Sequence, residues 1–286
     1  VVIDIAMTET AREADYVLPA TTQLEKAEAT FFNFEFPENY FHVRAPLFPA
    51  PDGVLDEAEI HARITEALGG IPSGILDELN SALTEGGREA FRNLVFKKLG
   101  DDPTIGRIAP VLLYRTLGKT LPNKMQNAAA VWAVCHQHAL AKRSSVEAAG
   151  ITGEGMDLGD NLFDAIIDGP SAVIISKEDW SDIWNRVPGG AINFDLPDML
   201  GAAANLNSEE PQETTDEFPF LMSAGERRDY TANTIFRNPA WRRKDRDGAM
   251  YMNPEDAARL NLGDGSNARI TSQRGVVEVL VEVNDR

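Results

Sequence analysis

The residues best suited to chemistry lie in an arginine-rich window toward the C-terminal end of the sequence. Residues 225–246 hold seven basic and three acidic residues, which leaves a net charge of +4. Six of the seven basic residues are arginines, whose guanidinium groups can hold a phosphate through two parallel hydrogen bonds. Gly225, Thr231, Asn233 and Asn238 add small or hydrogen-bonding groups. The window could bind an anionic ligand, or it could be a solvated loop paired with acids elsewhere.

The rest of the chain has the opposite charge. The 286 residues carry a formal net charge of −18, so the chain repels nucleic acid and anionic lipid, and we expect neither as a partner. With 43% hydrophobic and 25% charged residues, the composition is that of a globular protein. No apolar run approaches the ~20 residues of a membrane-spanning helix, so we predict no membrane insertion. An anionic ligand therefore needs a local reversal of charge.

Cys135, His136 and His138 are a second group that could do chemistry, as metal ligands. A single cysteine forms no internal disulfide and cannot hold an iron–sulfur cluster, which needs about four thiolates. Cys135 and His138 could share one helix face, but a structural zinc site needs about four ligands. The other histidines, His42 and His61, are distant in the sequence. We therefore predict a packed or surface helix here, and no metal site.

The N-terminal part of the sequence, residues 1–70, has the pattern of an α/β fold. Val1-Val2-Ile3-Asp4-Ile5-Ala6 is typical of a buried strand, and a second apolar stretch, Tyr16-Val17-Leu18, ends at Pro19. A helix is predicted from Asp56 to Leu68, with Gly69-Gly70 as its stop. A buried strand of this kind normally follows other strands, because parallel pairing needs crossover connections. We therefore expect a piece of a longer protein, with material missing on both sides.

A mainly helical region and then a β region follow. We predict helices over 75–83, 91–99, 127–149, 157–167 and 179–187, and a strand over 172–175. Residues 207–217 are the predicted linker, because they contain five acids, one proline and no large apolar residue. Beyond it we predict a helix over 254–260 and strands over 218–223, 249–252, 267–272 and 276–283. Short strands with one small helix suggest a compact barrel.

Two sets of motifs resemble the molybdopterin oxidoreductases, the family of dimethyl sulfoxide reductase and formate dehydrogenase. The N-terminal set is Met7-Thr8-Glu9-Thr10-Ala11-x-x-Ala14-Asp15-Tyr16-Val17-Leu18-Pro19-Ala20, followed by Glu25 and Glu28-Ala29-Thr30-Phe31-Phe32-Asn33. The C-terminal set resembles the family's molybdopterin-dinucleotide-binding domain, a double-psi β-barrel. Its motifs are Gly225-Glu226-Arg227, Arg237-Asn238-Pro239, Asn253-Pro254-Glu255-Asp256-Ala257-Ala258-x-Leu260-x-Leu262-x-Asp264-Gly265 and Ser272-x-x-Gly275.

The resemblance implies the C-terminal part of a bis-molybdopterin guanine dinucleotide oxidoreductase similar to formate dehydrogenase. Residues 1–70 would end an α/β molybdopterin-binding domain, 71–206 would be helical, 207–217 an acidic linker and 218–286 an incomplete double-psi β-barrel. The iron–sulfur cluster, the protein ligand to molybdenum and most catalytic residues are expected in the missing N-terminal part, so we name no catalytic residue. A small-molecule substrate, an electron-transfer partner and a cytoplasmic location are implied.

The resemblance also implies which residues contact the cofactor, molybdopterin guanine dinucleotide with molybdenum. Met7, Thr8 and Thr10 match a loop at the mouth of the α/β sheet, and Asn33 and Glu35 match a loop that contacts the nucleotide end. The other implied contacts lie in the barrel loop that faces the pterin and its phosphates: Gly225, Glu226, Arg227, Arg228, Tyr230, Thr231 and Asn233. Two departures from the family pattern are Ala29, where a glycine is usual, and Glu226, which interrupts a frequent Gly-Arg pair.

Some conspicuous residues in these motifs are expected to be structural. Asp15 reads as a capping or turn aspartate, and Pro19 as a strand terminator. Phe31, Phe32, Phe34 and Phe36 are expected to pack in the core and at interfaces rather than to stack on a base. Two functions stay open at this stage. The chain is either a cofactor-clamping part of a two-electron oxidoreductase or a non-catalytic binding or assembly module that retains the barrel.

Overall fold

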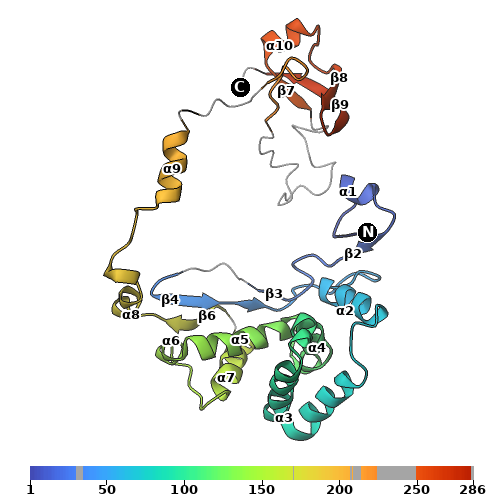
Figure 1. The fold of residues 1–286 in the computed structure, drawn as a ribbon. Coiled ribbons are helices and arrows are strands. Elements are labelled where there is room, and N and C mark those ends of the chain that lie inside the picture. Colours follow the sequence, from blue (N-terminus) through green and yellow to red (C-terminus); the bar gives the residue numbers. More distant parts are fainter. Residues whose placement is uncertain (30–34, 170, 207, 209–213, 224–248, 285–286) are drawn as a thin grey trace. The chain divides into compact units, whose positions relative to one another are not determined.

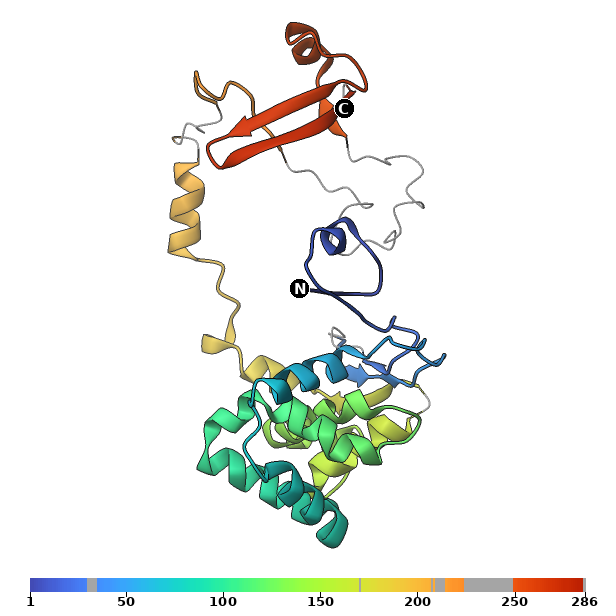
Figure 2. The ribbon, with the colours of Figure 1, turned by 90° about the vertical axis from the view of Figure 1, so that its right-hand side faces the viewer.

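The computed structural model describes residues 1–284 apart from 30–34, 170, 207, 209–213 and 224–248. The chain divides into two compact units (Figures 1 and 2), of which the first comprises Val1–Ile5 and Ala14–Ile192. The second comprises Ala6–Glu13 and Asn193–Arg286. The four domains predicted from the sequence stay predictions.

The first unit is mainly helical, with short paired strands. Its helices are α2 (Glu57–Ala67), α3 (Ile75–Asp101), α4 (Ala109–Arg115), α5 (Ala130–Ala141), α6 (Arg143–Ala148), α7 (Asp157–Asp168) and α8 (Trp180–Asn185). Its strands are β1 (Val2–Asp4), β2 (Val17–Pro19), β3 (Glu28–Ala29), β4 (Glu38–Phe41), β5 (Val43–Arg44) and β6 (Val173–Lys177). Among the described residues, no helix combines the length and the apolar character needed to cross a membrane.

Helices α2 and α3 begin where the local sequence supplies a suitable residue. The Asp56 carboxylate caps α2 by accepting a hydrogen bond from the Ala58 N–H at 2.8 Å. Gly74 precedes α3 in the left-handed conformation, at φ 78°. A second left-handed glycine, Gly87 at φ 68° and ψ −164°, kinks α3 partway along. The two patterns predicted over 75–83 and 91–99 are therefore the two arms of one kinked helix.

The prediction of one continuous helix over 127–149 is wrong. This stretch consists of a 3₁₀ turn at Gln126–Ala129 followed by α5 and α6. The break lies at Lys142, whose φ of −135° and ψ of 36° are not helical. The alanine-rich sequence favours one continuous helix, but α6 packs against β6, and this tertiary packing overrides the local propensity.

The strand pairs join segments from different parts of the first unit. β1 and β2 are parallel, with Val2 opposite Val17. β3 and β5 are antiparallel, and so are β4 and β6, which bring Phe41 opposite Val173. Figure 1 shows β4 and β6 side by side next to α5 and α6. Strands β3, β4 and β5 were not predicted from the sequence.

The core of the first unit lies between α3, α4, α5 and α7. Its largest fully buried side chains are Trp132, Phe91 and Phe163. The Trp132 ring lies 5.6 Å from that of Phe91, centroid to centroid. Helices α5 and α7 approach closely at Gly159, where an added Cβ would lie 2.3 Å from Nδ1 of His136. A glycine is needed at this contact because no side chain fits there.

The second unit contains a small mixed sheet. Its elements are α1 (Glu9–Arg12), α9 (Pro197–Asn205), β7 (Met250–Met252), α10 (Pro254–Arg259), β8 (Asn267–Ser272) and β9 (Gly275–Val283). β9 is the central strand, parallel to β7 and antiparallel to β8. Figure 2 shows the hairpin that β8 and β9 form. The strand predicted over 218–223 is absent from these described residues, because Pro219 cannot donate a ladder hydrogen bond and Leu221 and Met222 are exposed. The double-psi β-barrel stays a prediction.

Candidate functional site

The sequence-predicted loop around residues 7–10 forms the start of α1. The Thr8 hydroxyl accepts a hydrogen bond from the Ala11 N–H at 3.3 Å and so caps this short helix. Met7 and Thr10 are exposed. All three belong to the second compact unit, which also contains residues 193–286. The fold therefore groups these predicted cofactor contacts with the C-terminal region rather than with β1 and β2.

Glu35 is the fourth predicted contact that the structure describes. It is exposed and precedes Phe36, whose ring lies 4.1 Å from that of Trp180 on α8. Phe36 is therefore engaged in packing within the first unit. The remaining predicted contacts lie outside the described residues: Asn33, Gly225, Glu226, Arg227, Arg228, Tyr230, Thr231 and Asn233.

The cysteine and histidines of α5 lie at or near the core. Cys135 is buried, and burial first and then Asp164 and Asp160 raise the pKa of its thiol to about 12. His136 is also buried, with Nε2 at 3.4 Å from Oδ1 of Asp160. Burial and then the charge of Lys142 lower the pKa of His138. Among described residues, His, Cys, Asp and Glu side chains form no group of three or more that could hold a metal ion.

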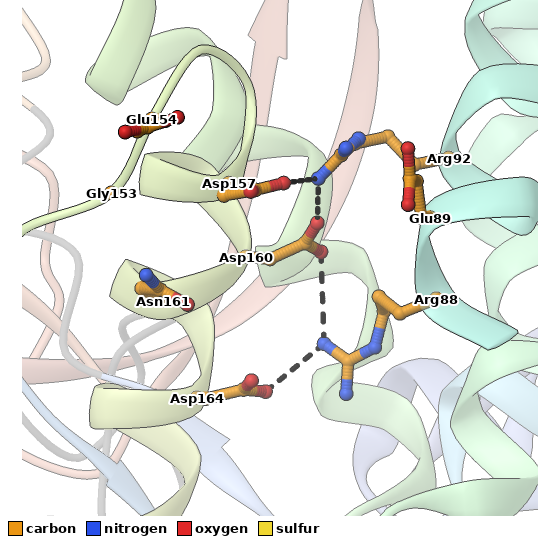
Figure 3. Close-up of a pocket in the computed structure, with 9 residues that line it drawn as sticks. All are labelled: Arg88, Glu89, Arg92, Gly153, Glu154, Asp157, Asp160, Asn161 and Asp164. Atoms are coloured by element: carbon orange, nitrogen blue, oxygen red, sulfur yellow. Dashed lines mark hydrogen bonds and ion pairs between the residues drawn. The ribbon is translucent and has the colours of Figure 1, made fainter.

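The structure reveals an open, charged cavity between α3 and α7 that the sequence did not predict (Figure 3). Its volume is about 470 Å³, within the usual range of ligand sites at ~300–1,000 Å³. Helix α3 contributes Arg88, Glu89 and Arg92. Helix α7 and the loop before it contribute Gly153, Glu154, Asp157, Asp160, Asn161 and Asp164. Five carboxylates therefore face two guanidinium groups.

A network of ion pairs joins the two helices across this cavity. Arg92 Nη1 donates to Oδ1 of Asp157 at 2.7 Å and to Oδ2 of Asp160 at 2.5 Å. Arg88 donates to Asp164 at 3.0 Å and lies 3.8 Å from Asp160. Figure 3 shows both arginines reaching from α3 toward the carboxylates of α7. Asp160 is thus the central acceptor of the network.

Asp160 is held in its ionised form by neighbours on two sides. The indole N–H of Trp132 donates to its Oδ1 at 2.7 Å, so that one oxygen faces α5 while the other faces Arg92. Burial alone would raise the pKa of Asp160, but the hydrogen bonds from His136, Trp132 and Arg92 outweigh burial and lower it. The carboxylate is therefore a stable negative charge in the wall of the cavity.

A spacing signal for this network exists in the sequence. Asp157, Asp160 and Asp164 are three and four residues apart, so a helix places them on one face, and Arg88 and Arg92 are four apart. Nothing in the sequence indicates that these two faces meet. The packing of α3 against α7 decides that, as where Arg88 lies over the Phe163 ring at 5.4 Å.

The comparison with known families concerns the C-terminal region. Residues 220–286 match the family described as Molydopterin dinucleotide binding domain. The match covers under a quarter of the chain and includes β7, α10, β8, β9 and the arginine-rich window. It is consistent with the C-terminal part of a molybdopterin oxidoreductase of the dimethyl sulfoxide reductase family. The resemblance predicted from the motifs is thereby confirmed.

Proposed function

We propose that this chain clamps molybdopterin guanine dinucleotide with molybdenum in an oxidoreductase similar to formate dehydrogenase. The observation that carries the proposal is the molybdopterin dinucleotide binding domain at residues 220–286. When bound, the cofactor would supply two-electron redox chemistry on a small substrate. The residues of this chain would bind and orient it, because in cofactor enzymes the protein contributes positioning and electrostatics. An iron–sulfur cluster, an electron-transfer partner and a cytoplasmic location belong to the same proposal.

The charge distribution supports this role. A dinucleotide carries a doubly charged pyrophosphate, which a chain of net charge −18 would repel without local compensation. The window 225–246, with its net charge of +4, lies within the matched domain. Arg227 and Arg228 would form charge-assisted hydrogen bonds to the pyrophosphate. Tyr230, Thr231 and Asn233 would add neutral donors, a set of groups that suits a long polar dinucleotide.

The short strand pair of the first unit supports the α/β part of the proposal. β1 and β2 are parallel, yet Val2, Ile3, Val17 and Leu18 are only partly buried. Parallel strands occur almost only in sheets that are covered on both faces. A two-stranded parallel pair with half-buried apolar residues is therefore what a portion of a larger α/β sheet would look like. We keep the double-psi β-barrel around β7, β9 and β8 as part of the same proposal.

The test uses the protein that contains this chain, purified after expression with molybdate. We expect two pterin dinucleotides for each molybdenum, the ratio of a bis-molybdopterin guanine dinucleotide cofactor. Arg227→Ala combined with Arg228→Ala should weaken cofactor binding at least about tenfold, because hydrogen bonds to a charged group contribute ~1.5–3 kcal/mol each. Pterin and molybdenum per protein are the readouts, with circular dichroism to show that the variant is folded.

A matched control comes from the same domain. Arg269→Ala combined with Arg274→Ala removes the same charge from exposed positions of the β8–β9 hairpin and should leave occupancy unchanged. Equal losses in both double variants would mean that general charge, and not the predicted loop, governs binding. A wild-type protein without pterin or metal would overturn the proposal in favour of a non-catalytic binding or assembly module.

A further inference from the structure

Glu178 is a nearly buried carboxylate that ties β6 and α8 to the helices of the first unit. Its side chain is 10% exposed, and its Oε1 lies 3.4 Å from Nζ of Lys142, the residue between α5 and α6. Its Oε2 accepts a hydrogen bond at 3.1 Å from Arg186, at the end of α8. The Ser145 hydroxyl of α6 donates to the same carboxylate. One carboxylate at the end of β6 therefore joins α6 and α8.

The imidazole of His138 lies at this junction with one nitrogen unpartnered. Its Nε2 is buried and has no hydrogen-bond partner among the described residues. The ring donates a hydrogen bond to the Ile175 carbonyl of β6, and because Nε2 has no partner, the donor is Nδ1. In the neutral ring Nε2 then carries only a lone pair. Protonation would make it a buried N–H donor without an acceptor, which costs free energy.

The surroundings of this ring oppose a proton on balance. Burial is the main cause of the lowered pKa of His138, and the positive charge of Lys142 is the next. The Glu178 carboxylate acts in the opposite direction, but it is already shared between Lys142 and Arg186. The neutral ring is therefore the form that fits the closed junction.

The remaining charges on the elements packed against α5 have partners elsewhere. In the described part of the chain, Lys142 and Glu178 are the charged groups that shift the pKa of His138. The others on β6, α6, α4 and α7 form these ion pairs: Lys177 with Glu38, Arg143 with Glu147, Arg115 with Glu59 and Glu66, Asp160 and Asp164 with Arg88, and Asp157 with Arg92. Asp168, at the end of α7, is exposed.

We propose that His138 is a pH-sensitive switch, which holds β6 and α8 against α5 and α6 when its ring is neutral and loosens them when the ring takes up a proton. Since the pKa of the folded histidine is lowered from 6.5, the junction has its full stability above that pH. As the pH falls, the opened state binds the proton more readily than the closed state, so opening becomes more frequent.

The position of the junction gives the switch a consequence. β6 and α8 are the last strand and the last α-helix before the first unit ends at Ile192. The loosened segment is therefore the one that leads along the chain into the second unit. None of the residues proposed to bind the cofactor belongs to this junction, so the switch stands independently of the proposed function.

The experiment is amide hydrogen exchange, read by mass spectrometry on the protein that contains this chain, at about pH 5.5 and pH 7.5. After correction for the intrinsic pH dependence of exchange, residues 173–186 should open at least about threefold more often at the lower pH. His138→Asn keeps an amide donor for the Ile175 carbonyl but takes up no proton, so it should abolish the increase. His61→Asn, at an exposed histidine of α2, is the matched control and should retain it.

Two charge variants should change this response in opposite directions and leave the histidine in place. Lys142→Met removes the charge that opposes protonation, so opening should rise less between the two pH values. Glu178→Gln removes the compensating negative charge, so opening should rise more. Burial alone would raise the pKa of Glu178, but Lys142 and Ser145 outweigh burial and lower it, so this carboxylate stays ionised over the range.

A direct measurement completes the test. Deuterium exchange at the Cε1 hydrogen of His138 reports its pKa in the folded protein, which should lie below about 6.5. A value at or above that of a free histidine would overturn the proposal. So would a wild-type protein whose opening does not depend on pH, an equal increase in His138→Asn, or a change in the same direction in both charge variants.

Discussion

The two compact units differ in how much apolar surface their described residues bury. The first unit encloses Trp132, Phe91 and Phe163 at 0% exposure. Among the described residues of 193–286, the buried apolar side chains are those of Ala257 and Val281. Burial of apolar surface is the dominant favourable term in folding, so the first unit has a stable core of its own. If the second unit binds the proposed cofactor, we expect the cofactor to stabilise it, because a ligand that binds the folded state stabilises that state.

The substitution with the largest expected effect on this contrast is Trp132→Ala in the first unit. The change removes a ring packed against Phe91 and Phe96, together with the indole N–H that donates to Asp160. We expect a loss of about 3–5 kcal/mol in the free energy of unfolding, measured in urea. Trp180→Ala, at a side chain from the same unit that is 67% exposed, is the control and should cost far less. Equal losses would mean that the core does not lie where the structure places it.

Two glycine substitutions should change stability in opposite directions. Gly159→Ala would place a Cβ 2.3 Å from His136 and should destabilise the first unit by about 1–3 kcal/mol, as overpacking does. Gly201→Ala lies within α9 in the second unit, where an added Cβ meets nothing within 4 Å. It should stabilise that helix by about 0.5–1 kcal/mol. Thermal unfolding followed by circular dichroism compares them, and a Gly159→Ala variant as stable as the wild type would contradict the close α5–α7 contact.

The pH dependence of stability gives a smaller effect, confined to the first unit. The folded-state pKa of Asp160 is lowered, so its contribution is complete above the unfolded pKa of about 3.9. That contribution is lost as the pH falls through the lower folded pKa. We expect Asp160→Asn to flatten the acid limb of a plot of unfolding free energy against pH. Asp198→Asn in α9 should leave that limb unchanged, and a variant slope equal to the wild type would contradict the assigned role of Asp160.

The smallest expected effect concerns Cys135, whose thiol should resist alkylation in the folded chain. This cysteine is the sequence's one thiol, and burial raises its pKa to about 12. An alkylating reagent at about pH 8 should therefore leave the folded chain unmodified and label one thiol after unfolding in denaturant. Mass spectrometry reads both results. Rapid labelling of the folded chain would show that the first unit opens, and so would weaken the contrast between the units.

Local patterns predicted much of the secondary structure. The strand at Asn267–Ser272 has the predicted bounds, and α2, α7 and α10 lie within a few residues of theirs. Caps such as Asp56 and Asn253 act within one turn of the chain, which is why a sequence reveals them. The break at Lys142 was missed because it depends on the packing of α6 against β6. The pairing of β4 with β6 was missed because its partners are far apart in the sequence.

The sequence by itself determined the charge reversal at residues 225–246 and the motifs that the family match at 220–286 confirms. Both are properties of residue type and order, which need no neighbours in space. Only the tertiary structure decided that Arg88 and Arg92 meet Asp157, Asp160 and Asp164. These residues come from two segments whose helical spacing predicts a charged face on each and nothing about which faces meet. These faces meet through packing between distant segments, such as the α5–α7 contact at Gly159, which local sequence patterns do not describe.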